Sequence, residues 1–425
     1  MRFLFRTRPY RFRPPDRKTR WYRALLPLVG PVLRLLYRVT GFRVRGIERL
    51  RATLSAGRAV LLPANHAKDA DPGLMVKLSQ AVGRPFHFMA SCELFDQHHG
   101  FDGWLLSHFG AFSVDRAGAD KASLEMAVDV LAEGVRPLVV FPEGTVYNTN
   151  DRVGPFLDGV SFIAREASRR RTRDGRPPVA IHPVAIKYFY QGDLRDRMSQ
   201  CLARIERRLG YRPRRGDDLV DRLYHAGEVF LSRHEKALGL DASNRNLPLG
   251  VRLEAFVARK LEGLETAITG RVQTGETIHR VRRMQAAVVA DLIEHPADSE
   301  LHRVRTGQLE DILQILQAVS YPGDYVSRHP STERLAETLE KLEDDVLGAG
   351  GPMGPMRAEI VVCPAMPVPT EAPRLGPRRR EASDPLSARI QSAIQREINR
   401  LTAEHEERRG GRTLLLPSRP RAAVS

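Results

Sequence analysis

A histidine and a carboxylate lie five residues apart in the block Asn-His-Ala-Lys-Asp-Ala-Asp, in which His66 precedes Asp71. An imidazole takes up a proton near neutral pH, and a carboxylate on its other ring nitrogen fixes the tautomer and stabilises the imidazolium. On a continuous helix, residues five apart differ by roughly 140° and do not face each other. The two side chains can therefore meet only across a loop, which Pro63 before the block and Asp71-Pro72 after it predict. The spacing indicates His66 as a general base oriented by Asp71.

The same block permits two other interpretations. Aspartate is a common helix N-cap, so Asp71 could simply cap a helix while His66 lies on a surface loop. Asp69 also lies in the block and could orient His66 in place of Asp71. Both alternatives stay open at the level of the sequence.

Three further blocks carry residue types that can bind a substrate. Gly110 begins a strand-like block that ends at Arg116, and a guanidinium matches an anionic phosphate in fork geometry. Residues 140–145, Val-Phe-Pro-Glu-Gly-Thr, end a strand in a turn, and ligands of α/β proteins gather where strands end. Residues 179–186 form a strand that contains a proline. Singly, these blocks also fit an Arg solvated beside Asp115, an ordinary Pro-Gly turn and core packing.

The blocks lie between segments that alternate in pattern between strand and helix. Short apolar runs predict strands at 58–63, 85–90, 111–114, 137–141 and 178–186, and helical periodicity predicts helices at 71–80, 121–133 and 156–168. This alternation predicts an α/β domain in which a mixed central sheet is flanked by helices.

From residue 192 to 347 the pattern is helical, with a capped amphipathic helix at 331–342 as the clearest case. A strand at 359–364 and a helix at 385–404 follow a Gly/Pro linker. We therefore expect an all-helical insertion in the α/β domain. The predicted parts are a basic arm with an interfacial amphipathic segment (1–43), the α/β domain (44–190 and 357–408), the helical insertion (191–356) and a disordered basic tail (409–425).

The formal charge of +16 and the sequence pI near 10.2 indicate a polyanionic partner, either a nucleic acid or an anionic membrane face. Basic strands interleaved with aromatic residues and a recognisable reading helix are both missing, so we expect no nucleic-acid partner. The apolar run at 24–37 is too short to span a bilayer, for which roughly 20 residues are needed. With arginines around it, the run can lie in the membrane interface or form an ordinary buried helix.

Three widely spaced cysteines, Cys92, Cys201 and Cys363, exclude a disulfide framework and a Cys-x-x-Cys zinc site, and they suit a reducing compartment. The histidines outside the first block have no ligand spacing, so we expect no metal. We expect no signal peptide, because no apolar core with a small-residue cleavage site opens the chain.

Taken together and in this order, the four blocks resemble the glycerolipid acyltransferase family that includes the lysophosphatidate acyltransferases. The family's Asn-His-x4-Asp block matches Asn65, His66 and Asp71, and its Gly-x5-Arg block matches Gly110 and Arg116. Its Phe-Pro-Glu-Gly block matches 141–144, and its Val-Pro-Val-type strand matches 181–184. The resemblance covers about 44–190 and resumes at 357–405.

The resemblance implies a membrane-associated enzyme of phospholipid biosynthesis. It would move a fatty acyl group from acyl-CoA or acyl carrier protein to a lysophospholipid hydroxyl, with 1-acyl-sn-glycerol 3-phosphate as the favoured acceptor and phosphatidic acid as the product. His66 would act as general base with Asp71, without an acyl-enzyme and without a cofactor beyond the thioester co-substrate. The implied substrate-binding residues are Asn65, Gly110, Arg116, Pro142, Glu143, Gly144 and Thr145. Because a carboxylate repels phosphate, we expect Glu143 to meet a hydroxyl or pair with an Arg. The implied location is peripheral, at the cytoplasmic membrane face.

The chain also departs from the family pattern. Val146 stands where an Arg usually follows Gly-Thr, and Leu157 and Asp158 replace a basic residue often found before Gly159. Loss of these cations weakens the case for a phosphate-bearing acceptor, so the acceptor could be a non-phosphate lysolipid, although Arg152 could compensate. Glycerol 3-phosphate is a further alternative acceptor, because the shape of the acceptor pocket is not encoded in blocks of this length. The insertion is atypical and could serve as a lid, a membrane-contacting face or a dimerisation element. A catalytically silent membrane adaptor is the alternative from another class.

Overall fold

The computed structural model describes residues 9–116, 120–213, 216–240, 246–369 and 384–408, so the predicted tail at 409–425 lies outside the described residues. The strands are β1 (Val39–Arg45), β2 (Val60–Pro63), β3 (His87–Ser91), β4 (Ala111–Val114), β5 (Leu138–Val140), β6 (Ala180–Ile181), β7 (Val184–Tyr190), β8 (Met356–Val362) and β9 (Met366–Pro367). The helices before β8 and outside the insertion are α1 (Arg20–Leu36), α2 (Ile47–Ser55), α3 (Asp71–Val82), α4 (Cys92–Phe95), the 3₁₀ turn η1 (Gln97–Gly100), α5 (Phe101–His108), α6 (Lys121–Glu133) and α7 (Gly159–Arg173).

The predicted α/β class with mixed sheets and a helical insertion is confirmed, but the strands form two sheets rather than one. Six strands pair in the order β4-β3-β5-β2-β6-β9, and all are parallel except β9. The other three pair in the order β1-β8-β7, with β7 antiparallel to β8.

Pro183 lies at the division between the two sheets. The predicted single strand at 178–186 breaks after Ile181 and resumes at Val184, so that β6 belongs to one sheet and β7 to the other. Proline has no N–H to donate to a ladder, which explains the break. A bridge between Ala64 and Val184 keeps the two sheets in contact at this point.

The six-stranded sheet is buried on both faces. Along β2, Leu62 points into a core shared with α1, α2 and α3, and Leu61 points into a second core shared with α6, α7 and the C-terminal helix α15 (Pro385–Arg408). This alternation is the period-two geometry of a strand, and parallel strands covered on both sides are apolar throughout. β2, β4 and β5 run in the same direction, so their carboxyl ends lie at the same edge of the sheet.

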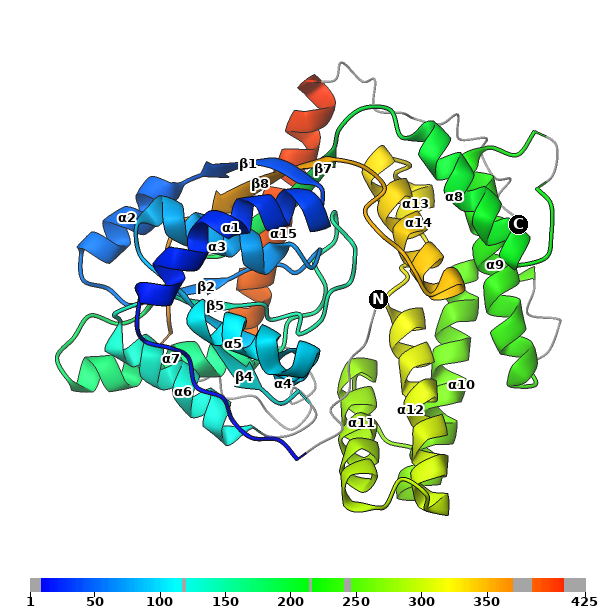
Figure 1. Cartoon of the computed structure of the whole chain (residues 1–425), viewed down its shortest axis with the longest axis horizontal. Coiled ribbons are helices and arrows are strands. Elements are labelled where there is room, and N and C mark those ends of the chain that lie inside the picture. Colours follow the sequence, from blue (N-terminus) through cyan, green and yellow to red (C-terminus); the bar gives the residue numbers. More distant parts are fainter. Residues whose placement is uncertain (1–8, 117–119, 214–215, 241–245, 370–383, 409–425) are drawn as a thin grey trace.

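The chain between β7 and β8 is helical, and Figure 1 shows it (green to yellow) beside the α/β part. It comprises α8 (Arg195–Arg208), α9 (Leu219–Ala237), α10 (Leu249–Thr269), α11 (Thr277–Glu294), α12 (Glu300–Val319), α13 (Tyr325–Arg328) and α14 (Thr332–Leu347). α10, α11 and α12 pack around a core of their own, whereas α14 packs against α8 and β7. α14 therefore joins the insertion to the α/β part.

α1 is a continuous helix although it contains Pro27 and Pro31. Both prolines are exposed, so water can bond to the two carbonyl groups that they leave without an N–H donor. The opposite side of α1 is buried: Leu33 lies against Gly73 of α3, and the Tyr22 hydroxyl bonds to Ser79 Oγ at 2.6 Å. α1 is thus docked on α3 along one side only.

Candidate active site

His66 and Asp71 meet across the loop between β2 and α3. The distance from His66 Nδ1 to Asp71 Oδ2 is 3.0 Å. β2 ends at Pro63, and α3 begins at Asp71 with Pro72 behind it, which is the loop geometry that the spacing requires. Ala70 rather than Asp71 occupies the helix cap, and Asp69 is exposed. Of the two carboxylates in the block, the one at 71 contacts the imidazole.

The Asp71 carboxylate is fully buried and accepts three hydrogen bonds. Oδ2 accepts from the Lys68 amide at 2.9 Å as well as from His66, and Oδ1 accepts from the Tyr188 hydroxyl. Burial, followed by the charge of Asp71, raises the pKa of Tyr188 well above its usual value, so the phenol keeps its proton and donates. Three donors therefore hold this one carboxylate in place.

The hydrogen bond at Nδ1 fixes the state of the imidazole. With Nδ1 as the donor to Asp71, the lone pair lies on Nε2, which has no hydrogen-bond partner within the described part of the chain. The ring stacks on Phe141 with centroids 4.2 Å apart, and its side chain is 16% exposed. The imidazole is therefore held rigidly, with one basic nitrogen available to a bound hydroxyl.

Glu143 holds the backbone of the first block rather than meeting an Arg. Its Oε1 accepts the amide N–H of His66 at 2.7 Å, and its Oε2 accepts that of Gly154 at 2.8 Å. Burial raises the pKa of Glu143 to about 7, although the two amide donors oppose this shift. Among the described residues Glu143 pairs with main-chain amides and not with an Arg, and its contact with a substrate hydroxyl stays a prediction.

Three other residues implied by the resemblance have structural contacts. The Asn65 amide spans to Ile186 of β7, donating to its carbonyl at 2.9 Å and accepting from its N–H at 2.7 Å. Gly110 has φ +88°, and a Cβ there would lie 2.6 Å from the Phe86 carbonyl oxygen. Pro142 is buried, and its carbonyl accepts the N–H of Leu157 at 2.9 Å. The contacts of Asn65 and Pro142 shape the loops around His66, whereas Gly110 lies at the amino end of β4, away from that edge of the sheet.

Two guanidinium groups lie at the turn after β5. Arg116 Nη1 donates to the Gly144 carbonyl at 2.9 Å, and its Nη2 lies 3.8 Å from Glu93. Arg282, from α11 of the insertion, lies against the same glycine, 2.5 Å from where a Cβ would be. Gly144 has φ +66°, which glycine adopts without strain. Thr145 follows, partly exposed.

Residues of α14 contact the first block and the loop that follows the third block. The sequence did not predict these contacts. Lys68 donates from Nζ to Glu340 Oε2 at 2.8 Å, and Tyr190 donates to Glu340 Oε1 at 2.6 Å. The amide of Asn150 donates to Glu337 Oε2 at 3.0 Å. In the sequence, Glu337 and Glu340 lie on a predicted helix whose leucines recur with helical spacing. This pattern predicts the helix but not the residues that the two acids contact.

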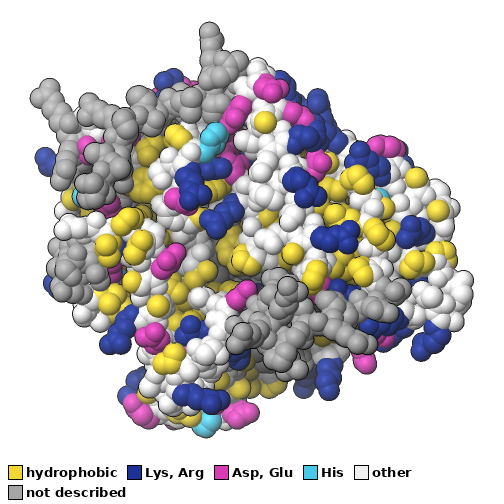
Figure 2. Space-filling view, turned by 180° about the vertical axis from the view of Figure 1, so that it is seen from behind, with side chains coloured by type: hydrophobic (Ala, Val, Ile, Leu, Met, Phe, Trp, Pro, Cys, Tyr) yellow, Lys and Arg dark blue, Asp and Glu magenta, His cyan; other side chains and the backbone are white. Residues whose placement is uncertain are grey.

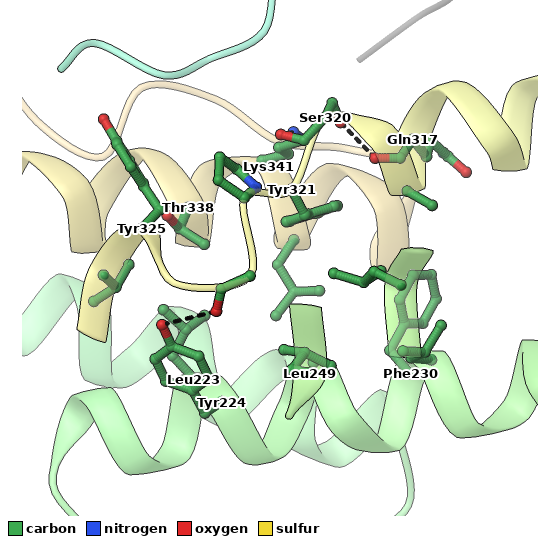
Figure 3. A pocket seen from close by; sticks show the side chains of 18 of the residues that line it. Leu223, Tyr224, Phe230, Leu249, Gln317, Ser320, Tyr321, Tyr325, Thr338 and Lys341 are labelled. Atoms are coloured by element: carbon green, nitrogen blue, oxygen red, sulfur yellow. Dashed lines mark hydrogen bonds between the residues drawn. The ribbon is translucent and has the colours of Figure 1, made fainter. Parts of the chain in front are cut away.

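A largely apolar cavity lies within the insertion, between α9, the start of α10, and the segment from α12 to α14 (Figure 3). Figure 3 shows Leu223, Phe230, Leu249 and Tyr321 around it, with the amine of Lys341 at its edge. His66, Asp71 and Arg116 do not line this cavity, but Asn148 and Thr149, which follow the third block, do. The loop after β5 therefore borders this cavity, whereas the His66–Asp71 pair does not.

Two buried histidines outside the first block have structural partners. His87 is buried with Nδ1 3.0 Å from the Gly110 carbonyl, and burial lowers its pKa to about 4. His182 lies between Thr53 and the Cys363 carbonyl, and burial lowers its pKa. Within the described ranges, His, Cys, Asp and Glu form no group of three that could hold a metal ion.

The helices and the surface charge relate to the two expected partners, a membrane and a polyanion. None of the described helices combines the length and the apolar character needed to cross a bilayer. Figure 2 shows the face opposite to that of Figure 1, on which Lys and Arg side chains are scattered among acidic and apolar ones. On that face the positive charge does not form one continuous stripe.

Comparison with known proteins places the site in a family domain. Residues 41–187, from β1 to β7 and including all four blocks, match the model of the Acyltransferase family. The chain is also 32% identical over 110 residues to the 1-acyl-sn-glycerol-3-phosphate acyltransferase of Streptococcus pneumoniae (strain ATCC BAA-255 / R6). That alignment covers 26% of this chain and 38% of the bacterial protein. For residues 41–187, the family expected from the four blocks is confirmed.

Proposed function

Because residues 41–187 belong to the acyltransferase family, we propose that the protein transfers a fatty acyl group from a thioester to the hydroxyl of a lysophospholipid. The observation that carries this proposal is the His66–Asp71 pair, with Nδ1 bound to a buried carboxylate and Nε2 open. The bacterial relative is named for 1-acyl-sn-glycerol 3-phosphate, which supports that acceptor and phosphatidic acid as the product.

The chemistry follows from the open nitrogen of His66. Nε2 takes the proton of the acceptor hydroxyl as its oxygen attacks the thioester carbonyl of acyl-CoA or acyl carrier protein, and Asp71 stabilises the resulting imidazolium. When the carbonyl bond reforms, the C–S bond breaks, and the imidazolium returns its proton to the departing thiolate. A positioned base of this kind contributes about 10²–10⁴ in rate. The acyl group passes directly to the acceptor, and the protein supplies no resident cofactor.

A membrane surface is the source of such an acceptor, and α1 with α5 offers a face that fits one. Leu28, Val32, Leu35 and Leu36 of α1 are exposed, with Leu35 at 78%. Trp21 of α1 and Trp104 of α5 are in edge contact, with centroids 5.4 Å apart. An apolar helix side with aromatic residues and flanking arginines suits the membrane interface. We place the protein peripherally, at the cytoplasmic face.

An acyl-transfer assay with purified protein tests the function. Radiolabelled acyl-CoA and acyl carrier protein thioester are offered with 1-acyl-sn-glycerol 3-phosphate, other lysolipids and glycerol 3-phosphate. We expect transfer to the lysophosphatidate, and we expect His66→Ala to lower kcat by about 10²–10⁴. His98→Ala is the matched control, because His98 also contacts a carboxylate, that of Asp102 at 2.9 Å, but at an exposed site. Equal rates for the wild type and His66→Ala would exclude the mechanism.

Vesicle flotation tests the membrane face. Leu35→Asp places a charge on the exposed side of α1, and we expect it to lower the fraction bound to vesicles containing anionic lipid. Val135→Asp is the control, since Val135 is 67% exposed outside α1 and α5. Equal flotation of the two variants would place the membrane contact elsewhere.

A further inference from the structure

The insertion brings a cation to the turn after the third block. Arg282 Nη2 lies 2.5 Å, and its Cζ 3.5 Å, from where a Cβ of Gly144 would be, and the Leu157 side chain is the other neighbour of that point. Arg116 bonds to the carbonyl of the same glycine at 2.9 Å. Two guanidinium groups, from β4's end and from α11, therefore converge on one residue.

Arg282 differs from the other partly buried arginines of the insertion. Arg252 pairs with Glu235, Arg280 with Glu265 and Arg222 with Glu206, each at 2.5–2.8 Å. Arg282 makes no hydrogen bond or ion pair with any described residue, although it is half-buried. The opposing charges nearby are weak: Glu93 lies 3.8 Å from Arg116, and Glu143 has its carboxylate engaged by amides.

This arrangement is costly until an anion enters it. Burial and then the positive charge of Arg116 lower the pKa of Arg282 to about 10, and Tyr147 opposes the change. An unpaired buried charge is unfavourable, and two like charges at one glycine add to the cost. A guanidinium binds phosphate through parallel N–H donors, so a dianionic phosphate between the two would remove both penalties.

We propose that Arg282 and Arg116 together bind the phosphate monoester of the acyl acceptor, so that the helical insertion determines acceptor specificity. The inference rests on the proposed acyl transfer and adds to it a residue outside the matched domain, Arg282, that would select a monoester dianion over a phosphodiester that carries its own cation. Gly144 follows Glu143, whose Oε1 holds the His66 amide at 2.7 Å, so the anion site lies within the same loop cluster as the base. Arg152, the residue that the sequence offered as a substitute cation, is exposed.

Kinetics with two acceptors that differ only in the phosphate test the proposal. Wild type, Arg282→Ala, Arg282→Lys and Arg283→Ala are assayed with 1-acyl-sn-glycerol 3-phosphate and with the corresponding monoacylglycerol. Loss of a charge-assisted contact predicts that Arg282→Ala raises KM for the phosphate acceptor about 10- to 100-fold. We expect little change in kcat and none in kcat/KM for monoacylglycerol. Arg282→Lys recovers part of the loss, because the charge remains without the fork.

Arg283→Ala is the matched control, because Arg283 is the next residue of α11, is exposed and bonds to Gln273 at 2.6 Å. Calorimetric titration with glycerol 3-phosphate, a soluble phosphate monoester, separates this inference from the proposed function. Binding to wild type that weakens at least tenfold in Arg282→Ala supports the anion site, even if no acyl transfer is found. If the protein transfers acyl groups but Arg282→Ala keeps the wild-type KM for the phosphate acceptor and the wild-type affinity for glycerol 3-phosphate, then Arg282 only packs against Leu157.

Discussion

Replacing Asp71 with asparagine isolates the charge that faces His66. The carboxylate accepts from His66 Nδ1 and the Lys68 amide on Oδ2 and from Tyr188 on Oδ1. In Asp71→Asn the amide oxygen can keep the first two bonds, and the amide NH₂ can face Tyr188, whose hydroxyl can turn to accept. The substitution therefore keeps the shape and the hydrogen-bond count of the site while removing one negative charge.

The expected effect is large on the rate and small on the fold. The imidazolium that forms as the hydroxyl loses its proton would no longer face an anion, and in Ser-His-Asp enzymes the corresponding change lowers kcat by about 10⁴. Because a positioned base contributes a factor of about 10²–10⁴ to the rate in all, we expect Asp71→Asn to lower kcat by a factor within that range. The unfolding free energy should fall by only about 1 kcal/mol, the net worth of a typical hydrogen bond.

Tyr188→Phe is the comparison, because it removes one donor to the same carboxylate and leaves the imidazole–carboxylate contact in place. A buried hydrogen bond to a charged group is worth about 1.5–3 kcal/mol, so this variant should be less stable than Asp71→Asn yet retain kcat within about tenfold. Steady-state acyl transfer and thermal denaturation measure the two quantities. If Asp71→Asn folds and keeps kcat within a factor of about three, the carboxylate only anchors the loop, and the base assignment loses its support.

Two further variants test the loops on either side of the imidazole. Glu340→Gln leaves the buried Lys68 ammonium without the carboxylate that contacts it at 2.8 Å, so we expect a loss of about 3–5 kcal/mol in unfolding free energy. In a double-mutant cycle, the variant Lys68→Met/Glu340→Gln should recover part of this loss. Additive losses from the two substitutions would contradict the pairing. For Glu143, burial raises the folded pKa to about 7 from 4.5, so its contribution to stability is fully present below pH 4.5 and is lost as the pH rises through 7, on the order of 3 kcal/mol. Urea denaturation across pH 4.5–8 should show this decline in the wild type and a shallower one in Glu143→Gln, and identical slopes would refute the assignment.

Local patterns in the sequence predicted the part of the site that local chain geometry determines. Pro63 ends a buried strand and Asp71-Pro72 starts a helix, so a loop had to bring His66 back onto Asp71. The same reasoning placed the helix at 121–133 at its observed bounds. It gave no strand for 39–45, because burial along this strand does not alternate regularly and its partner β8 lies more than 300 residues later.

The contacts between the insertion and the α/β part could not be predicted from the sequence. Lys68 and Glu340 are 272 positions apart, and the sequence around either residue does not predict its contact with the other. Arg282 lies among the arginines of an amphipathic helix, and only its contact with Gly144 distinguishes it from Arg283. The division of the sheet at Pro183 had a visible signal, a proline within an apolar run, but a proline on an edge strand has the same appearance.

The insertion is tied to both loops that flank His66, and this constrains how the site can have been assembled. Glu340 of α14 neutralises Lys68, which is buried in the first block, and Glu337 of the same helix accepts the Asn150 amide beyond the third block. α14 also packs on β7, whose Tyr188 holds Asp71. A buried ammonium deprived of its partner costs several kcal/mol, so an α/β part without the insertion would bear that cost within the loop that carries His66, the proposed base. Catalytic geometry and the packing of the insertion are therefore a single energetic unit, and variation in the insertion should alter acyl transfer even where it touches no substrate.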